Sequence, residues 1–150
     1  MSTGVSHISP QSPGDLLSSI SREVTQERVE AYAEAARDFN PIHLDEQFAA
    51  GTQFGRRIAH GMLILAFVSE MLAADFPDTW HTGGRLKVRF KNPVFAGETV
   101  TTFGEITAVR DSPAGPVAEC TVGCRRPDGF EAVSGQAFVP LGRADGGPSR

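Results

Sequence analysis

The spacing of hydrophobic and polar residues along the chain changes near residue 85. Before that point, apolar residues recur at helical spacing on one face, at Val29, Tyr32, Ala33 and Ala36. Residues 62–72 are apolar at nearly every position, which predicts a helix that is buried on most sides. From residue 85 the run RLKVRF alternates charged and apolar residues, as half-buried strands do. The pattern therefore predicts helices first and strands afterwards.

The limits of the first helix follow from its end signals. Thr25 stands where an N-cap belongs, directly before the helical pattern. Pro41 disfavours helical geometry at Asn40, so we expect this helix to end near Arg37 or Asp38.

Turn residues divide the rest of the chain into short elements. We expect turns at PAGP (residues 113–116) and PDG (residues 127–129). The other expected elements are a weak first strand at 16–24, a short helix at 45–50, the long helix from His60, and then three or four antiparallel strands, of which the first is at 85–90.

The economical packing of these elements is an α+β domain in which an antiparallel sheet curls round the apolar helix. We expect this single domain at 15–141, between a flexible lead at 1–14 and a disordered tail at 142–150. One curled sheet leaves strand edges uncovered, so we expect a homodimer.

Composition and charge exclude several classes of protein. The net charge of -4 argues against nucleic acid as the main partner. The N-terminus lacks the pattern of a secretory signal, and the most apolar segment, 58–72, is too short to span a membrane. We therefore expect a soluble cytoplasmic protein without a membrane partner. Cys120 and Cys124 lie roughly 13 Å apart if they share a strand, beyond the reach of a disulfide, and their spacing is no metal motif.

The stretch RDFNPIHLD (residues 37–45) places Asp38 and His43 five residues apart. In an unbroken helix they would diverge by about 140°, but a rigid, extended Asn40–Pro41 step can aim both into one cavity. An imidazole and a carboxylate on either side of a water can remove one proton and deliver another, which suits addition of water to a double bond. The alternatives are an ordinary polar turn, or a metal site with His60, which the spacing does not favour.

The stretch RRIAHGML (residues 56–63) begins the apolar helix with Gly61. The first turn of a helix has free backbone N–H groups and favours negative charge. A thioester carbonyl placed there would gain stabilisation as its oxygen becomes an enolate oxyanion. Alternatively, Gly61 only permits close packing and His60 bonds locally.

Together, DFNPIHLD and AHGML, followed by LKVRFKNPVFAGE (residues 86–98), resemble the MaoC-like dehydratase family and within it the single-domain (R)-specific enoyl-CoA hydratases. The resemblance spans residues 15–141. It implies a dimeric hotdog fold, Asp38 and His43 as the catalytic pair, and the Gly61 N–H as oxyanion donor. The implied reaction is reversible syn addition of water to a trans-2-enoyl-CoA, giving an (R)-3-hydroxyacyl-CoA.

The resemblance also implies a substrate site. Its expected residues are the motif positions Asn40, His60 and Met62 and the acyl-pocket positions Ser69, Leu72 and Val139. The last two are equally good core residues. No separate cofactor is expected, because coenzyme A is part of the substrate. Two sets of basic residues could meet the phosphates of CoA. One is Arg56 and Arg57, and the other is Arg85, Lys87, Arg89 and Lys91. The alternative is that both sets are simply solvated.

Other functions share much of this pattern. A dehydratase acting on a 3-hydroxyacyl carrier protein, or on branched or dicarboxylic acyl-CoA, would carry the same motifs. A hotdog thioesterase would direct water at the thioester carbonyl instead. A non-catalytic acyl-CoA-binding module is the alternative from another class, but such modules would be expected to lose the Asp38–His43 pair.

Overall fold

The computed structural model describes residues 9–142. Their elements follow the expected order of helices before strands. The helices are α1 (Gln26–Ala36), α2 (Pro41–Leu44), α3 (Glu46–Ala50), α4 (Gly61–Asp75) and α5 (Trp80–Gly83). The strands are β1 (Ser21–Glu23), β2 (Arg85–Phe90), β3 (Thr99–Arg110), β4 (Val117–Arg125) and β5 (Glu131–Pro140).

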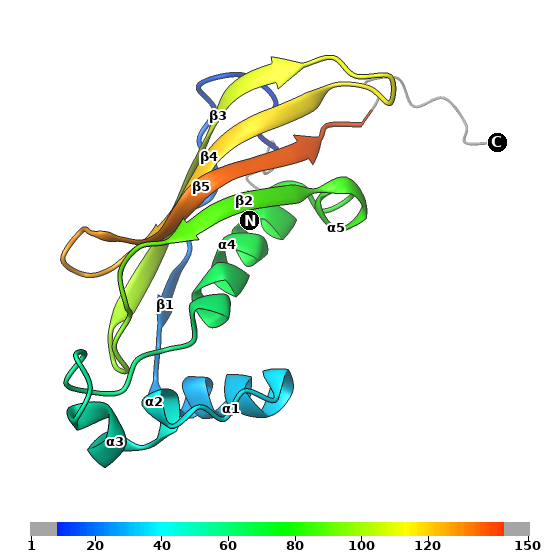
Figure 1. Cartoon of the computed structure of the whole chain (residues 1–150). Helices are drawn as coiled ribbons and strands as arrows, with labels where there is room; N and C mark the ends of the chain where they lie inside the picture. The colour runs from blue at the N-terminus through cyan, green and yellow to red at the C-terminus, as the bar shows by residue number, and fades with distance from the viewer. Residues whose placement is uncertain (1–8, 143–150) are drawn as a thin grey trace, which may run out of the picture.

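One antiparallel sheet with the strand order β1-β3-β4-β5-β2 forms the body of the protein. The sheet curls, and α4 lies along its inner side (Figure 1). Helix α4 supplies the centre of the core, because Val68, Met71 and Leu72 are fully buried. This is the α+β arrangement of a sheet wrapped round an apolar helix that the sequence predicts. Helices α1, α2 and α3 form a separate group beyond the N-terminal end of α4 (Figure 1).

The first strand is much shorter than predicted. Only Ser21–Glu23 form a continuous ladder with β3, and Leu16 contributes one isolated bridge to Glu105. Between them, the backbone N–H and hydroxyl of Ser18 both donate to the buried Asp75 carboxylate, each over 2.6 Å. The Ser18 N–H is thereby taken out of the ladder with β3, although the Leu17 N–H still donates to the Gly104 carbonyl over 2.9 Å. The strand prediction for 16–24 is therefore wrong for most of its length.

A short helix that the sequence pattern does not predict, α5, follows α4. Its Trp80 is buried and donates from the indole N–H to the Ser69 hydroxyl over 2.9 Å. Four residues carry too little periodicity to be recognised, and the helix depends on this tertiary contact.

The expected lead and tail lie largely outside the described residues. Within the described part of the lead, the Gly14 N–H donates to the Ile106 carbonyl of β3 over 2.8 Å. Among residues 9–142, no helix is both long and apolar enough to cross a membrane. Cys120 and Cys124 are both buried and free, as predicted.

Candidate active site

Asp38 stands on the loop that ends α1. Arg37 adopts the left-handed conformation (φ 58°) that terminates the helix, and the Asp38 N–H still donates to Ala33 O over 3.1 Å. The Asp38 carboxylate accepts from the Asn40 N–H over 3.2 Å. The side chain is solvent-exposed, so the carboxylate is held at the mouth of the site and not within the core.

Pro41 acts differently from the prediction. Asn40 is extended (ψ 127°), as expected, but Pro41 opens the short helix α2. The ring of proline presets a helical φ at the first position, and the Asn40 side chain caps the turn by accepting from the Ile42 N–H over 3.1 Å. The rigid extended step is thus one residue long. A new helical turn then carries His43.

His43 is oriented by a backbone carbonyl. Its Nδ1 lies 2.7 Å from Ile58 O, and a carbonyl only accepts, so we assign the proton to Nδ1 and the free lone pair to Nε2. Burial lowers the pKa of His43 below its usual value, the bond to Ile58 opposes this, and the nearby His60 lowers it further. The ring is therefore held neutral near pH 7, in the form that accepts a proton.

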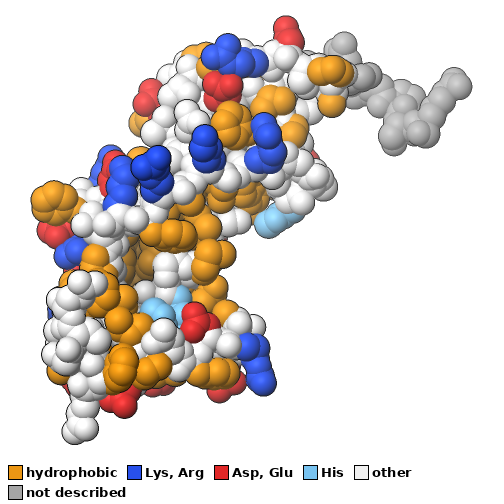
Figure 2. All heavy atoms as spheres, in the orientation of Figure 1, with side chains coloured by type: hydrophobic (Ala, Val, Ile, Leu, Met, Phe, Trp, Pro, Cys, Tyr) orange, Lys and Arg blue, Asp and Glu red, His pale blue; other side chains and the backbone are white. Residues whose placement is uncertain are grey.

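His60 joins the two predicted catalytic residues. Its ring stacks on that of His43 with centroids 3.8 Å apart, and its Nε2 lies 3.0 Å from the backbone carbonyl of Asp38. One ring nitrogen of each histidine and one Asp38 carboxylate oxygen all lie within 4.8 Å of one another. Figure 2 shows histidine and acidic side chains together in a hollow between the helices and the sheet. The separation matches one water bridging a base and a carboxylate.

The same three residues reopen the metal alternative, which sequence spacing did not favour. The rings are stacked 3.8 Å apart at an interplanar angle of 25°, so their lone pairs lie in separate, nearly parallel planes, which disfavours a shared ion. His60 Nε2 already faces a carbonyl, and its Nδ1 is buried without a hydrogen-bond partner in the described residues. The geometry thus suits a water between Asp38 and His43 better than a metal ion.

Gly61 begins α4 directly after His60. His60 is the N-cap residue and its carbonyl accepts from the Leu63 N–H over 3.1 Å, but it supplies no side-chain cap for the N–H groups of Gly61 and Met62. A Cβ on Gly61 would lie 3.0 Å from the ring of Phe90. The absence of a side chain at Gly61 therefore lets the Phe90 ring pack closely against the start of α4.

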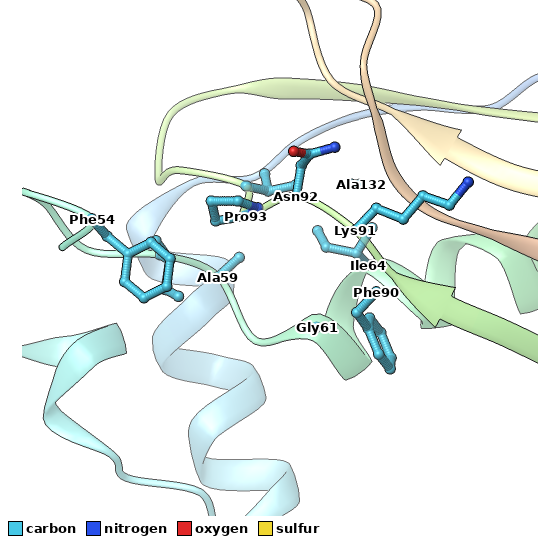
Figure 3. Close-up of a pocket in the computed structure, with 11 residues that line it drawn as sticks. Phe54, Ala59, Gly61, Ile64, Phe90, Lys91, Asn92, Pro93 and Ala132 are labelled. Carbon is cyan, nitrogen blue, oxygen red and sulfur yellow. The ribbon is translucent and has the colours of Figure 1, made fainter.

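An apolar cavity of about 290 Å³ opens beside Gly61 (Figure 3). Asp38 and His43 do not line it, but Ile58, whose carbonyl orients His43, does. The cavity is thus adjacent to the Asp38–His43 pair through two of its lining residues, Gly61 and Ile58. Its lining consists of Phe54, Ile58, Ala59, Gly61, Ile64, Phe90, Lys91, Asn92, Pro93, Val94 and Ala132.

The remaining predicted substrate residues lie elsewhere. Met62 is 55% exposed, next to Gly61. Leu72 and Val139 are fully buried in the core, and the Ser69 hydroxyl accepts from Trp80. None of these residues lines the cavity, so their role as an acyl pocket stays a prediction. Of the basic residues, Arg56 lies over the Phe95 ring at 4.1 Å.

Comparison with known proteins gives the same family at the level of sequence and structure. The family profile described as "MaoC like domain" matches residues 10–123. The (R)-specific enoyl-CoA hydratase of Aeromonas caviae is 38% identical over 122 residues, covering 81% of this chain and 90% of that protein. A mitochondrial 3-hydroxyacyl-[acyl-carrier-protein] dehydratase of Arabidopsis thaliana is 27% identical over 133 residues, or 88% of this chain and 78% of that protein.

Solved structures agree with these matches. The A. caviae (R)-hydratase involved in PHA biosynthesis superposes with a TM-score of 0.77 and 36% identity, over 87% of this chain and 97% of that chain. An unliganded R-hydratase from Pseudomonas aeruginosa gives a TM-score of 0.75 and 27% identity, over 93% of this chain and 92% of that chain. The fold predicted from the sequence, a hotdog sheet round a central helix, is confirmed by these likenesses.

Proposed function

The chain belongs to the MaoC-like dehydratase family, and from that premise we propose that it is a hydro-lyase that adds water reversibly to trans-2-enoyl thioesters. The product is the (R)-3-hydroxyacyl thioester. The observation that carries the proposal is the meeting of Asp38 and His43 within 4.8 Å, with His43 oriented so that Nε2 is its free acceptor.

The reaction uses the groups at the site as follows. A water held between Asp38 and His43 loses one proton to the pair as its oxygen bonds to the β-carbon of the enoyl group. The double-bond electrons move into an enolate, whose oxygen is stabilised by the Gly61 N–H at the start of α4. A proton from the same pair then goes to the α-carbon, so that water is added in full and the pair returns to its starting state.

Acyl-CoA is the substrate that we favour. The A. caviae relative, at 38% identity, acts on enoyl-CoA by its name, whereas the carrier-protein dehydratase is more distant at 27%. The apolar cavity beside Gly61 offers room for the acyl group next to the thioester. A dehydratase acting on acyl carrier protein is the second candidate, supported by the Arabidopsis relative.

We also propose a homodimer, as expected from the uncovered sheet edge. Strand β2 is the last strand of the sheet, and Phe90 at its end is 55% exposed, as is Met62 at the start of α4. Large exposed apolar side chains beside an open strand favour burial against a second copy. Sedimentation equilibrium of the purified chain tests this, and a monomer at micromolar concentration would contradict it.

The test of function is hydration of crotonyl-CoA, followed by loss of enoyl absorbance and by the chirality of the product. Asp38→Ala and His43→Ala should each lower the rate by at least about 10²-fold, the usual contribution of a positioned acid or base. Folded variants with near-normal rates would overturn the mechanism. Release of free CoA thiol without loss of enoyl absorbance would show a thioesterase instead.

A further inference from the structure

A row of cations lies along the outer face of the edge strand β2. Its members, which we call the basic stripe, are Arg85, Lys87, Arg89 and, just past the strand, Lys91. Leu86 and Val88 alternate with them and pack against the core, so the stripe faces away from α4. Figure 2 shows basic side chains gathered in a row over this part of the sheet.

Most of the stripe lacks an anionic partner. Lys91 pairs with Glu131 over 2.9 Å, whereas Arg85, Lys87 and Arg89 form no ion pair with any of residues 9–142. Arg85 lies over the ring of Phe138 at 5.1 Å. Of the other basic side chains in the described structure, three pair with acidic ones, as Arg22–Glu70, Arg110–Glu119 and Arg126–Asp128, and five do not. Three cations on alternate residues repel one another, and an external anion would relieve that repulsion.

The stripe leads to the cavity beside Gly61. Lys91 lines that apolar cavity and also borders a shallow hollow of about 300 Å³ that runs beside the stripe. Figure 3 places Lys91 at the side of the cavity nearest β2, with its ammonium directed away from Gly61. A molecule held on the stripe is therefore next to the opening through which a thioester reaches the Gly61 N–H groups.

We propose that the basic stripe docks an acidic helix of a carrier protein, which delivers the thioester into the cavity on its flexible arm. The proposal rests on the proposed function and adds to the favoured acyl-CoA a second carrier of the same thioester, with a docking surface of its own. Cations two residues apart along a strand repeat at about 6.7 Å, over about 20 Å from Arg85 to Lys91. Carboxylates at i and i+4 of a helix repeat at about 6 Å, which matches this row. The phosphates of CoA are compact and would engage only part of it.

Charge complementarity supports the choice of partner. The chain as a whole carries a net charge of -4, so an acidic protein is attracted to it only through local basic surfaces such as the stripe. A stripe of this kind steers an acidic partner to one orientation and raises the association rate, with an effect that falls as salt rises. The orientation selected here brings the carried thioester to Lys91 and the cavity.

The test compares one enoyl group on three carriers: an acidic acyl carrier protein, CoA and pantetheine without phosphate. In the variant Arg85→Glu/Lys87→Glu/Arg89→Glu, kcat/KM for the protein-bound substrate should fall by about 10- to 100-fold, the range of electrostatic steering. With CoA and pantetheine it should change less than about threefold. Added salt should weaken the wild-type reaction on the carrier protein in the same way.

A control variant and the other outcomes decide the proposal. Arg28→Glu reverses an exposed charge on α1, away from β2, and should leave all three substrates unaffected. An equal fall for CoA and carrier protein shows a phosphate site, and no fall for any substrate shows a solvated surface; either overturns the proposal. If the Glu triple variant also loses turnover of the pantetheine substrate, Arg85, Lys87 and Arg89 are replaced by Gln instead. The Gln variant must then lose kcat/KM for the protein-bound substrate alone, or the proposal fails. Absence of turnover of all three by the wild-type protein refutes the proposed function itself.

Discussion

The imidazole rings of His43 and His60 lie stacked, with centroids 3.8 Å apart and planes at 25°. Positive charge on one ring opposes protonation of the other, and besides burial this interaction lowers the pKa of His43. Burial is the main reason that the pKa of His43 lies below its usual value, and His60 adds to the effect. The stack therefore keeps a base available that exposed histidine would lose at mildly acidic pH.

The pH dependence of the reaction should show this lowered pKa. Hydration requires unprotonated His43, so kcat/KM should be full above the lowered pKa and fall as pH drops through it. The acidic limb should thus lie below the ordinary histidine value of about 6.5. Steady-state rates from pH 4.5 to 8, together with NMR titration of the His43 ring, check the assignment. A limb at or above 6.5 in both measurements would contradict it.

His60 should act through its neighbours. His60→Gln keeps a side-chain N–H that can donate to the Asp38 carbonyl but removes the stacked ring, so the acidic limb should move upward while kcat falls modestly. His60→Ala also removes the hydrogen bond that anchors Asp38, and misplacement of a catalytic group costs up to about 10²-fold. A purely structural role for His60 would lower stability in both variants without moving the pH profile.

A side chain at position 61 should lower the activity of the protein without preventing it from folding. In Gly61→Ala the new Cβ lies 3.0 Å from Phe90, whose exposed ring can shift, so the protein should fold. The methyl group crowds the position where a thioester oxygen meets the backbone N–H. Loss of such a donor costs about 10²- to 10³-fold in kcat. Gly51→Ala, where the nearest atom is 3.5 Å away, is the matched control and should remain active.

The convergence of Asp38 and His43 was predictable because the residues that break the helix lie between them. Asn40 and Pro41 signal an end of one helix, and the chain must turn there. The start of a second helix at Pro41 was missed, although proline is common at the first helical position and asparagine at the cap. Asn40 and Pro41 are compatible both with the end of one helix and with the start of the next.

Other parts of the site carry no local signal. Ile58 holds His43 through its backbone carbonyl, and His60 bonds the backbone carbonyl of Asp38, 22 positions away. Any residue type supplies a carbonyl, so neither contact leaves a mark in the sequence. Phe90 likewise meets Gly61 only because β2 ends beside the start of α4. The order of helices and strands along the chain predicts the sheet and its central helix. The site, in contrast, depends on tertiary contacts between those elements.

Cys120 and Cys124 should be inert in the native protein. Burial raises the pKa of Cys120 to about 11, with Asp75 contributing, and burial also raises that of Cys124. Only the thiolate reacts rapidly, so at pH 8 neither thiol should react with a disulfide reagent until the chain unfolds. Thiol titration in buffer and in denaturant measures the difference. Fast modification of the folded protein would show that this part of the sheet opens readily.

The bond between Ser18 and Asp75 should stabilise the fold in a way that the sequence did not predict. Asp75 is fully buried at the end of α4, and the Ser18 hydroxyl and N–H both donate to it over 2.6 Å. Ser18→Ala removes the hydroxyl and leaves the N–H, so unfolding should require about 1.5–3 kcal/mol less free energy, the usual value for a hydrogen bond to a charged group. Ser21→Ala, at an exposed position of β1, should change stability by less than about 0.5 kcal/mol. Urea denaturation of both variants gives the comparison. Equal stabilities would mean that the segment before β1 is held by its other contacts with β3 and that the Ser18 hydroxyl adds nothing to them.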